Sequence, residues 1–247
     1  MPYRSSGVSY AFGPGGMTPA VKAILYANIG VFLAVFVVRE LTLYLGLTPA
    51  RVFGSGWLWQ PFTYMFVHAD PLHILFNMLA VWMFGVELER AWGTREFTKY
   101  YLVTGLGAAA ATMLVSVLPF GFARPAYYAV TIGASGAVYG LLLAFAMRYP
   151  DRPLMFFPIP IPVPAKYFVL ILGAMALLMS LSAASSGVAH LAHLGGLLVG
   201  YVYLTRGRGG PMAELKYRWL KWRMARMRRR FDVVDGGRPS NDPRRFH

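Results

Sequence analysis

The sequence of 247 residues contains no cysteine and few charged residues. The lack of cysteine excludes disulfide bonds, thiolate metal sites and a cysteine nucleophile. Charged residues make up 14% of the chain and hydrophobic residues 57%, whereas an ordinary soluble domain carries roughly 25% charged residues. The mean hydropathy of +0.48 is correspondingly high. The composition therefore argues against a soluble domain and indicates a multi-pass membrane protein.

Acidic residues are particularly scarce, because 10 Asp and Glu stand against 24 Lys and Arg, for a net charge of +14. Most of the basic residues lie in the C-terminal tail. In residues 206–230 they alternate with Leu215, Trp219, Trp222 and Met227, a pattern typical of a helix on a membrane surface. We therefore expect the tail to bind anionic cytoplasmic lipid. Nucleic acid is the alternative partner, and we do not expect it.

The first helix is predicted from a start signal followed by an apolar run. Residues 1–17 are polar and glycine-rich, and they lack the basic start and apolar core of a cleaved signal peptide. We expect a loose cytoplasmic segment over residues 1–18. Thr18 supplies a capping hydroxyl and Pro19 a first-turn proline ahead of the apolar run at 23–38.

Five further apolar runs predict spanning helices, at residues 72–86, 100–118, 133–148, 167–181 and 188–204. Residues 48–71 are too broken by proline and glycine for a spanning helix and too aromatic for an aqueous loop, so we expect them at the membrane interface. Residues 151–166 contain four alternating prolines, which predict an extended connector. The fold class is therefore an all-α bundle of six transmembrane helices.

The distribution of basic residues predicts the orientation of this bundle. With six spans, all but three of the 24 Lys and Arg residues fall on the side of the two termini. The three exceptions are Arg39, Arg51 and Arg124. The positive-inside rule then places both termini in the cytoplasm. The predicted organisation is a cytoplasmic segment at 1–18, a six-helix domain at 19–205 and a basic cytoplasmic tail at 206–247.

Polar side chains recur in the first turns of the second, fourth and sixth predicted helices, which all start at the outer face. They are His73 and Asn77, then Ser135, then His190 and His193. Three separate stretches thus bring polar groups to one depth, and polar groups inside a membrane are functional candidates. Ser135 is either a nucleophile or a packing residue between helices. Tyr139, four residues later, shares its helix face and is either part of the site or a core aromatic.

Two GxxxG motifs predict close packing of the fourth and sixth helices. They consist of Gly136 with Gly140, and of Gly196 with Gly200. The second motif lies on the same helix face as His193. If the two motifs meet, His193 is carried toward Ser135, where it can take the hydroxyl proton.

The remaining histidines leave alternatives open. His190 is one turn from His193 and is either a supporting residue or a second catalytic group. His68 is predicted to be a hydrogen-bonding residue of the loop or interface. Four histidines near one level could bind a metal, but there is no HExxH motif and Asp70 is the only nearby carboxylate. We expect neither a metal nor a cofactor.

Three segments together resemble the rhomboid family of intramembrane serine proteases, in its bacterial-type six-helix form. They are Gly133-Ala134-Ser135-Gly136 with Tyr139, His73-Ile74-Leu75-Phe76-Asn77, and Ala192-His193-Leu194-Gly195-Gly196 ahead of Gly200. The resemblance covers residues 20–205, in the order of the family. Trp59-Gln60-Pro61-Phe62 is similar to the family's membrane-lying first loop, although a common form has arginine in place of Gln60.

The resemblance implies an endopeptidase with a Ser-His dyad that cleaves transmembrane protein substrates near their outer ends. It makes Ser135 the nucleophile and His193 the general base. His73 and Asn77, with the Ser135 backbone N–H, would bind the oxyanion. The supporting residues are Tyr139, which would stack on the His193 ring, Gly133, Gly136, Gly196 and His190.

The expected location is the inner membrane of a prokaryotic cell. A non-proteolytic relative that binds membrane client proteins is the alternative, although such relatives usually lack the dyad that this sequence contains.

Overall fold

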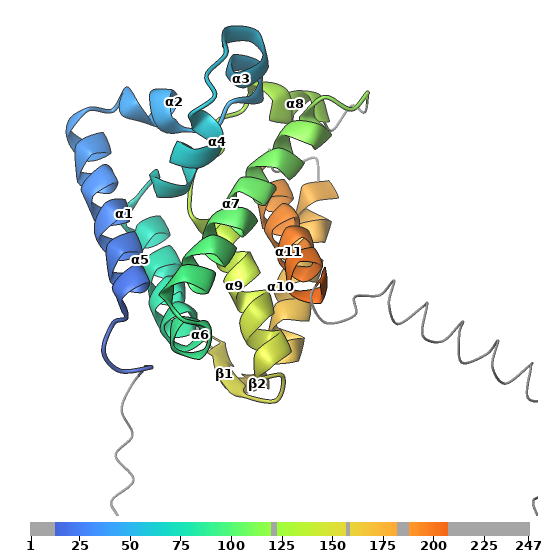
Figure 1. Ribbon diagram of the computed structural model, residues 1–247. Helices are drawn as coiled ribbons and strands as arrows, with labels where there is room; N and C mark the ends of the chain where they lie inside the picture. Colours follow the sequence, from blue (N-terminus) through green and yellow to red (C-terminus); the bar gives the residue numbers. More distant parts are fainter. Residues whose placement is uncertain (1–12, 120–122, 157–158, 182–187, 207–247) are drawn as a thin grey trace, which may run out of the picture. The chain divides into compact units, whose positions relative to one another are not determined.

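Long helices lie side by side in the part of the chain that the structure describes (Figure 1). This computed structural model describes residues 13–119, 123–156, 159–181 and 188–206. The chain divides into two units, Met1–Leu204 and Thr205–His247. The predicted membrane-surface helix lies outside the described residues except for its first residue, Arg206, as do residues 1–12 of the predicted N-terminal segment.

Helices account for most of the described elements. The α-helices are α1 (Pro19–Val37), α2 (Leu41–Leu45), α3 (Pro49–Ser55), α4 (Gln60–Thr63), α5 (Pro71–Ala80), α6 (Val86–Trp92), α7 (Thr94–Ser116), α8 (Ala123–Tyr128), α9 (Ser135–Arg148), α10 (Ala165–Leu181) and α11 (Val188–Arg206). The other elements are the 3-10 turn η1 (Tyr64–Phe66), the π-helical turn η2 (Val81–Gly85) and the strands β1 (Pro153–Phe156) and β2 (Ile159–Pro164).

Each predicted apolar run forms a helix: α1, the continuous α5–η2–α6 helix, α7, α9, α10 and α11. Within the described residues, two stretches are long and apolar enough to be candidate membrane spans, Pro19–Val37 and Pro71–Trp92. Helices Ser135–Arg148 and Ala165–Ser180 are apolar but shorter. Helices α7 and α11 are long but contain several glycines and polar residues, which suit packing against other helices.

Helix α1 begins at the predicted Thr18-Pro19 pair, but its cap differs from the prediction. The Thr18 side chain accepts no capping hydrogen bond, and its hydroxyl donates to the Glu89 carboxylate in α6. Glu89 accepts the backbone N–H groups of Ala20 and Val21, at 2.9 and 3.0 Å. The prediction that Thr18 caps α1 was therefore wrong, because an acidic side chain from another helix occupies the positive end of the α1 dipole.

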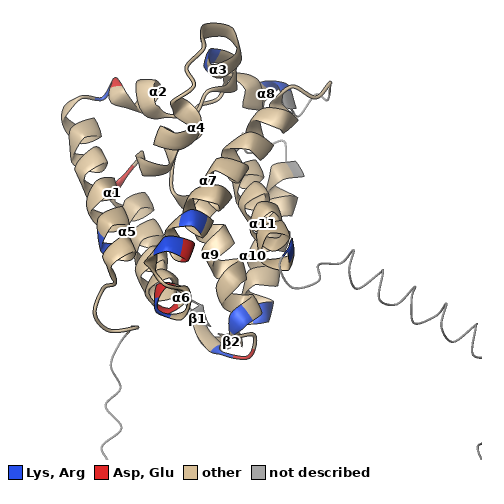
Figure 2. Ribbon diagram, viewed as in Figure 1, with Lys and Arg blue, Asp and Glu red and all other residues tan. Residues whose placement is uncertain are grey.

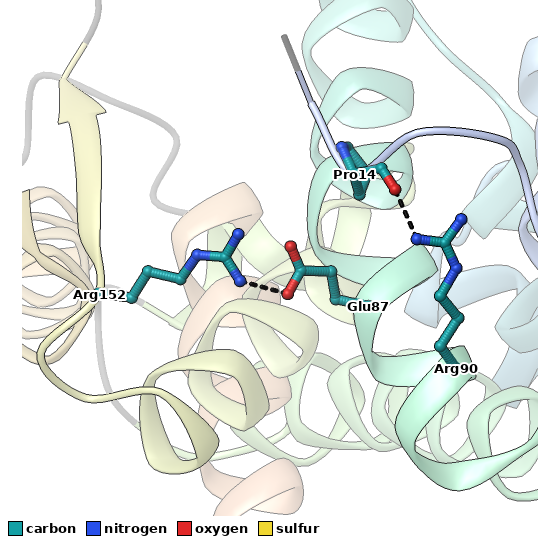
Figure 3. Close-up of polar contacts among 4 residues, drawn as sticks. All are labelled: Pro14, Glu87, Arg90 and Arg152. Atoms are coloured by element: carbon teal, nitrogen blue, oxygen red, sulfur yellow. Dashed lines mark hydrogen bonds and ion pairs between the residues drawn. The ribbon is translucent and has the colours of Figure 1, made fainter. Parts of the chain in front are cut away.

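The α5–η2–α6 helix runs well beyond the predicted apolar run and includes charged residues in its last two turns. Glu87 forms an ion pair with Arg152 from the loop before β1. Arg90 donates to the backbone carbonyl of Pro14, ahead of α1 (Figure 3), and to that of Gly16. Because each of these charged groups has a partner, the helix continues past the end of the apolar sequence.

Charged residues gather mainly at the end of the bundle that carries α6, the start of α7 and the hairpin (Figure 2). At this end Lys166 also pairs with Asp151, at 2.6 Å. The middle of the bundle is almost free of charge in the described residues (Figure 2). This banding is typical of helices that pass through an apolar layer.

Two connections contain short elements of their own. The proline-rich connector is extended, as predicted, and it folds into an antiparallel hairpin in which Leu154 pairs with Val163 and Met155 with Pro162. The connection that contains Arg124 includes the short helix α8. Neither element has the length or periodicity that a search for apolar runs detects.

The segment between α1 and α5 consists of short helices, in agreement with the prediction that it does not span. Gln60 is fully buried in it. Its carboxamide accepts from the Thr48 N–H at 3.0 Å and donates to the carbonyls of Leu43 and Tyr44, at 3.2 and 3.3 Å. Gln60 therefore joins α2 and α4 to the start of α3.

Candidate active site

Ser135 is the first residue of α9 and follows a tight turn. Gly133 in this turn has a φ of +112°, a conformation that residues with side chains rarely adopt. A Cβ atom on Gly133 would also lie 2.7 Å from His73 Nε2. Both constraints require glycine here, and they show that the His73 ring lies against the backbone that leads into Ser135.

Backbone hydrogen bonds hold the segment before Ser135. Leu47 and Thr131 form an isolated antiparallel bridge, with N···O distances of 2.9 and 2.8 Å. The Gly133 N–H donates to the Tyr64 carbonyl at 2.9 Å. The buried Tyr64 hydroxyl donates to the Gly105 carbonyl of α7 at 2.7 Å. The segment between α1 and α5 and helix α7 together position the start of α9.

The glycine motifs of α9 and α11 meet, as their spacing predicts. A Cβ atom on Gly196 would collide with the Gly136 carbonyl. A Cβ atom on Gly200 would lie 3.4 Å from the Gly140 Cα and 2.6 Å from the Tyr100 hydroxyl. No side chain fits between the two helices, so their backbones are in contact.

Helix α7 also packs against the contact between α9 and α11. A Cβ atom on Gly136 would lie 2.5 Å from the Ala108 Cβ, and one on Gly140 would lie 2.7 Å from the Thr104 Cβ. We refer to this contact of α7, α9 and α11, through Gly136, Gly140, Gly195, Gly196 and Gly200, as the glycine seam. It holds two helices that carry polar side chains at a fixed separation.

At the end of the glycine seam, His193 Nε2 lies 2.8 Å from Ser135 Oγ. The Tyr139 ring stacks on the His193 ring, with centroids 4.3 Å apart and planes 5° from parallel. The stacking restricts rotation of the imidazole, and the short N···O distance is suited to transfer of the hydroxyl proton to His193. In the described residues His193 Nδ1 is buried and has no hydrogen-bond partner.

His73 lies in the first turn of α5, beside this pair. The Asp70 side chain caps α5 by accepting the His73 backbone N–H at 2.9 Å. The ring Nδ1 accepts the Ala69 N–H at 3.3 Å. A neutral ring that accepts at Nδ1 carries its proton on Nε2, the atom that faces Gly133. His73 therefore presents a hydrogen-bond donor next to the Ser135 backbone N–H.

Asn77 lies one turn further along α5 and is nearly buried. Its amide nitrogen donates to the His73 carbonyl at 2.8 Å. Since a carboxamide nitrogen has two N–H groups, the second remains free to donate elsewhere. Asn77 can thus donate a hydrogen bond in the same region as His73.

His68 lies in the loop ahead of α5, and its predicted role as a hydrogen-bonding residue stays a prediction. Its side chain is 1% exposed. The ring packs against His73, with centroids 4.9 Å apart. Burial, together with the neighbouring His73, lowers the pKa of His68 to about 4, so its ring is neutral at pH 7.

His190 lies one turn before His193 on α11. The two rings are 5.8 Å apart between centroids and nearly perpendicular. Among the described residues, no group of three or more His, Cys, Asp or Glu side chains could hold a metal ion.

The residues that sequence reasoning missed support the site from outside. Glu89 and Gln60 act on backbone groups far along the chain, and Tyr64 and Tyr100 hydroxyls bond to glycine carbonyls. Two of them had a sequence signal: Glu89 is an acidic residue that follows an apolar run, and Gln60 stands where a common form of the family has arginine. Neither signal identifies a partner.

The described residues thus form a helical bundle in which a serine at the start of α9 meets a histidine of α11 across a glycine contact. The comparison with known proteins identifies the class more closely. A model of the Rhomboid domain family matches residues 55–208, and the chain belongs to the rhomboid family. It is accordingly an integral membrane protein.

Individual relatives agree with this assignment. The chain is 30% identical to Rhomboid protease AarA of Providencia stuartii over 154 residues, which are 59% of this chain and 54% of that protein. It is 29% identical to mitochondrial Rhomboid protein 1 of Saccharomyces cerevisiae over 202 residues, 74% of this chain and 52% of the relative. Rhomboid protease GluP of Bacillus subtilis matches at 26% over 156 residues, 63% of this chain and 27% of its own length. The chain thus spans about half the length of the first two relatives and about a quarter of the third.

Proposed function

We propose that this chain is an intramembrane serine endopeptidase that cleaves transmembrane segments of other membrane proteins near their outer ends. The 2.8 Å contact between Ser135 Oγ and His193 Nε2 carries the proposal. The names of two relatives, Rhomboid protease AarA and Rhomboid protease GluP, support it.

In the proposed reaction, Ser135 Oγ attacks the scissile carbonyl carbon while His193 Nε2 takes the hydroxyl proton. The carbonyl oxygen becomes an oxyanion. His193 then gives the proton to the leaving amine as the C–N bond breaks, which leaves an acyl-serine. Water attacks this ester with His193 as base, and the released carboxyl product restores the serine.

The donors around Ser135 suit the oxyanion of this scheme. The Ser135 backbone N–H belongs to the first turn of α9, where N–H groups have no partner within the helix and the dipole favours negative charge. His73 Nε2–H faces Gly133 just ahead of it, and the second N–H of Asn77 is the third proposed donor. Donors arranged before the reaction stabilise the developing charge most effectively.

The proposed topology has six transmembrane helices and both termini in the cytoplasm, because the basic residues favour that side. Ser135 then lies near the outer ends of the helices, where water can reach it. A substrate helix must unwind locally to expose a carbonyl, since its backbone groups are otherwise hydrogen-bonded. We place the protein in the inner membrane of a prokaryotic cell, with its basic tail on anionic lipid.

A labelled fluorophosphonate tests the nucleophile. We expect the wild type to be labelled, and Ser135→Ala and His193→Ala to remain unlabelled. Labelling of Ser135→Ala at the wild-type rate would sink the assignment of Ser135. The second test is incubation with a model single-pass substrate in liposomes. Substrate that binds but stays intact would favour a client-binding protein over a protease.

A further inference from the structure

Nδ1, the second ring nitrogen of His193, needs a hydrogen-bond acceptor that the contact with Ser135 does not provide. Nε2 can accept the serine proton only if the neutral ring carries its own proton on Nδ1. His193 Nδ1 is buried and has no hydrogen-bond partner among the described residues. A buried N–H without an acceptor disfavours the tautomer that the reaction requires.

In soluble serine proteases a buried carboxylate accepts a hydrogen bond from this N–H and so fixes the tautomer. In the described part of this chain no Asp or Glu forms a hydrogen bond or ion pair with His193. A charged carboxylate at this depth in a membrane would also be costly. A neutral acceptor avoids that cost, and an imidazole nitrogen is one.

His190 supplies such a nitrogen on the same helix. Its ring lies 5.8 Å from the His193 ring between centroids and is inclined by 83°. His190 Nδ1 is buried and also has no hydrogen-bond partner among the described residues. Two unpaired nitrogens on adjacent rings are thus enclosed together, one turn apart on α11. Since neither Nδ1 atom has a partner in the described part of the chain, the two do not bond to each other directly, and a buried water commonly joins polar atoms in this situation.

We propose that His190 is a positioning residue for the general base. His193 Nδ1–H donates to one water molecule, and that water donates to His190 Nδ1. The bridge holds His193 in the tautomer with Nε2 free and keeps the ring parallel to the Tyr139 ring. This inference rests on the proposed function.

His190 neither gains nor loses a proton in this arrangement. The proton of Ser135 moves to His193 Nε2 and later to the leaving amine. Nδ1 keeps its proton throughout, and the water bridge stabilises the imidazolium that forms in between. His190 therefore acts only through His193 and touches no reacting atom.

The test compares two substitutions of His190. In His190→Phe the ring shape remains but the acceptor is lost, and in His190→Asn the carboxamide oxygen can take the place of Nδ1. For cleavage of a model single-pass substrate in liposomes, we expect kcat of His190→Phe to fall about 5- to 150-fold, the equivalent of one unpaired buried donor. We expect KM to stay unchanged and His190→Asn to recover most of the loss.

A matched control separates this role from simple packing. Leu198→Phe places the same ring on an exposed position of α11 and should keep the wild-type kcat. Imidazole nitrogen-15 NMR of labelled protein, assigned with His193→Gln, reports the tautomer directly. We expect His193 to carry its proton on Nδ1 in the wild type and in His190→Asn, and to be a mixture of tautomers in His190→Phe.

The outcomes distinguish this inference from the proposed function. If the wild type fails to cleave substrate or to react with fluorophosphonate at Ser135, the proposed function is wrong. If the wild type reacts at Ser135 but His190→Phe keeps the wild-type kcat and the wild-type His193 tautomer, only the role of His190 is wrong. A loss of kcat in His190→Phe with an unchanged tautomer also overturns it, because the effect then lies in packing.

Discussion

Helices α9 and α10 follow each other in the chain and are both short and apolar, yet their surroundings differ. Most side chains of α9 are buried, and its glycines touch the backbone of α11 and side chains of α7. Helix α10 exposes many large apolar side chains, among them Leu170, Leu177 and Leu178. The helix that carries Ser135 is enclosed by protein, whereas α10 turns its apolar side chains outward.

The comparison shows what apolar content can and cannot predict. Both helices pass as membrane segments by hydropathy, but only small residues at helical spacing distinguish a helix enclosed by protein from one that faces lipid. A rigid backbone in α9 suits a site in which the short distance between Ser135 Oγ and His193 Nε2 must be maintained. The substitutions below compare the enclosed helices around Ser135 with α10.

The largest effect is expected from filling the glycine seam. In Gly196→Ala the new methyl group collides with the Gly136 carbonyl, a backbone atom that cannot move aside. We expect a loss of about 3 kcal/mol of stability, together with loss of activity. In Gly173→Ala on α10 the methyl group meets only the tip of Leu197, at 3.3 Å, and the melting temperature should stay near that of the wild type. Equal melting temperatures of the two variants in detergent would contradict the difference in enclosure between the glycine seam and α10.

The next effect concerns large apolar side chains. Leu141 on α9 is fully buried, and Leu178 on α10 is 69% exposed. We expect Leu141→Ala to lower the free energy of unfolding by about 2–5 kcal/mol, because it leaves a cavity. Leu178→Ala should change it by less than about 0.5 kcal/mol. Reversible unfolding in mixed micelles measures both, and a similar loss in the two variants would show that α10 is also covered.

Asn77→Ala separates chemistry from packing on the enclosed side of the bundle. The change removes one proposed oxyanion donor, and its hydrogen bond to the His73 carbonyl lies within α5. We expect kcat to fall roughly 10²- to 10³-fold while cleavage remains detectable. Fluorophosphonate labelling and melting temperature serve as controls for the intact fold. A wild-type kcat in the folded variant would remove Asn77 from the oxyanion site.

The smallest effect is expected at the start of α10. Lys166 pairs with Asp151, and both side chains are largely exposed. Exposed ion pairs contribute little to stability. Lys166→Ala should therefore leave the melting temperature and kcat unchanged. A clear drop in melting temperature would mean that α10 depends on this contact more than its exposure suggests.

The parts of the fold that were predictable are those with local signals. Apolar runs predicted the long helices, and the four-residue spacing of Gly136 and Gly140 predicted the contact that brings Ser135 to His193. The use of Glu89 as the cap of α1 was not predictable, because the donors lie about 70 residues away. The same holds for Gln60, whose burial depends on how α2 and α3 fold back. The roles assigned to the site residues stay predictions until the variants are measured.

The π-helical turn η2 determines how far the side chains of α6 are rotated about the helix axis relative to those of α5. In α6, Glu89 must face the start of α1. In α5, His73 and Asn77 must face Ser135. A wider turn accommodates one extra residue, and each residue of an α-helix turns the chain by about 100°. Deleting one residue from η2 would straighten the helix into regular α-helix and turn His73 and Asn77 away from Ser135 while Glu89 kept its place.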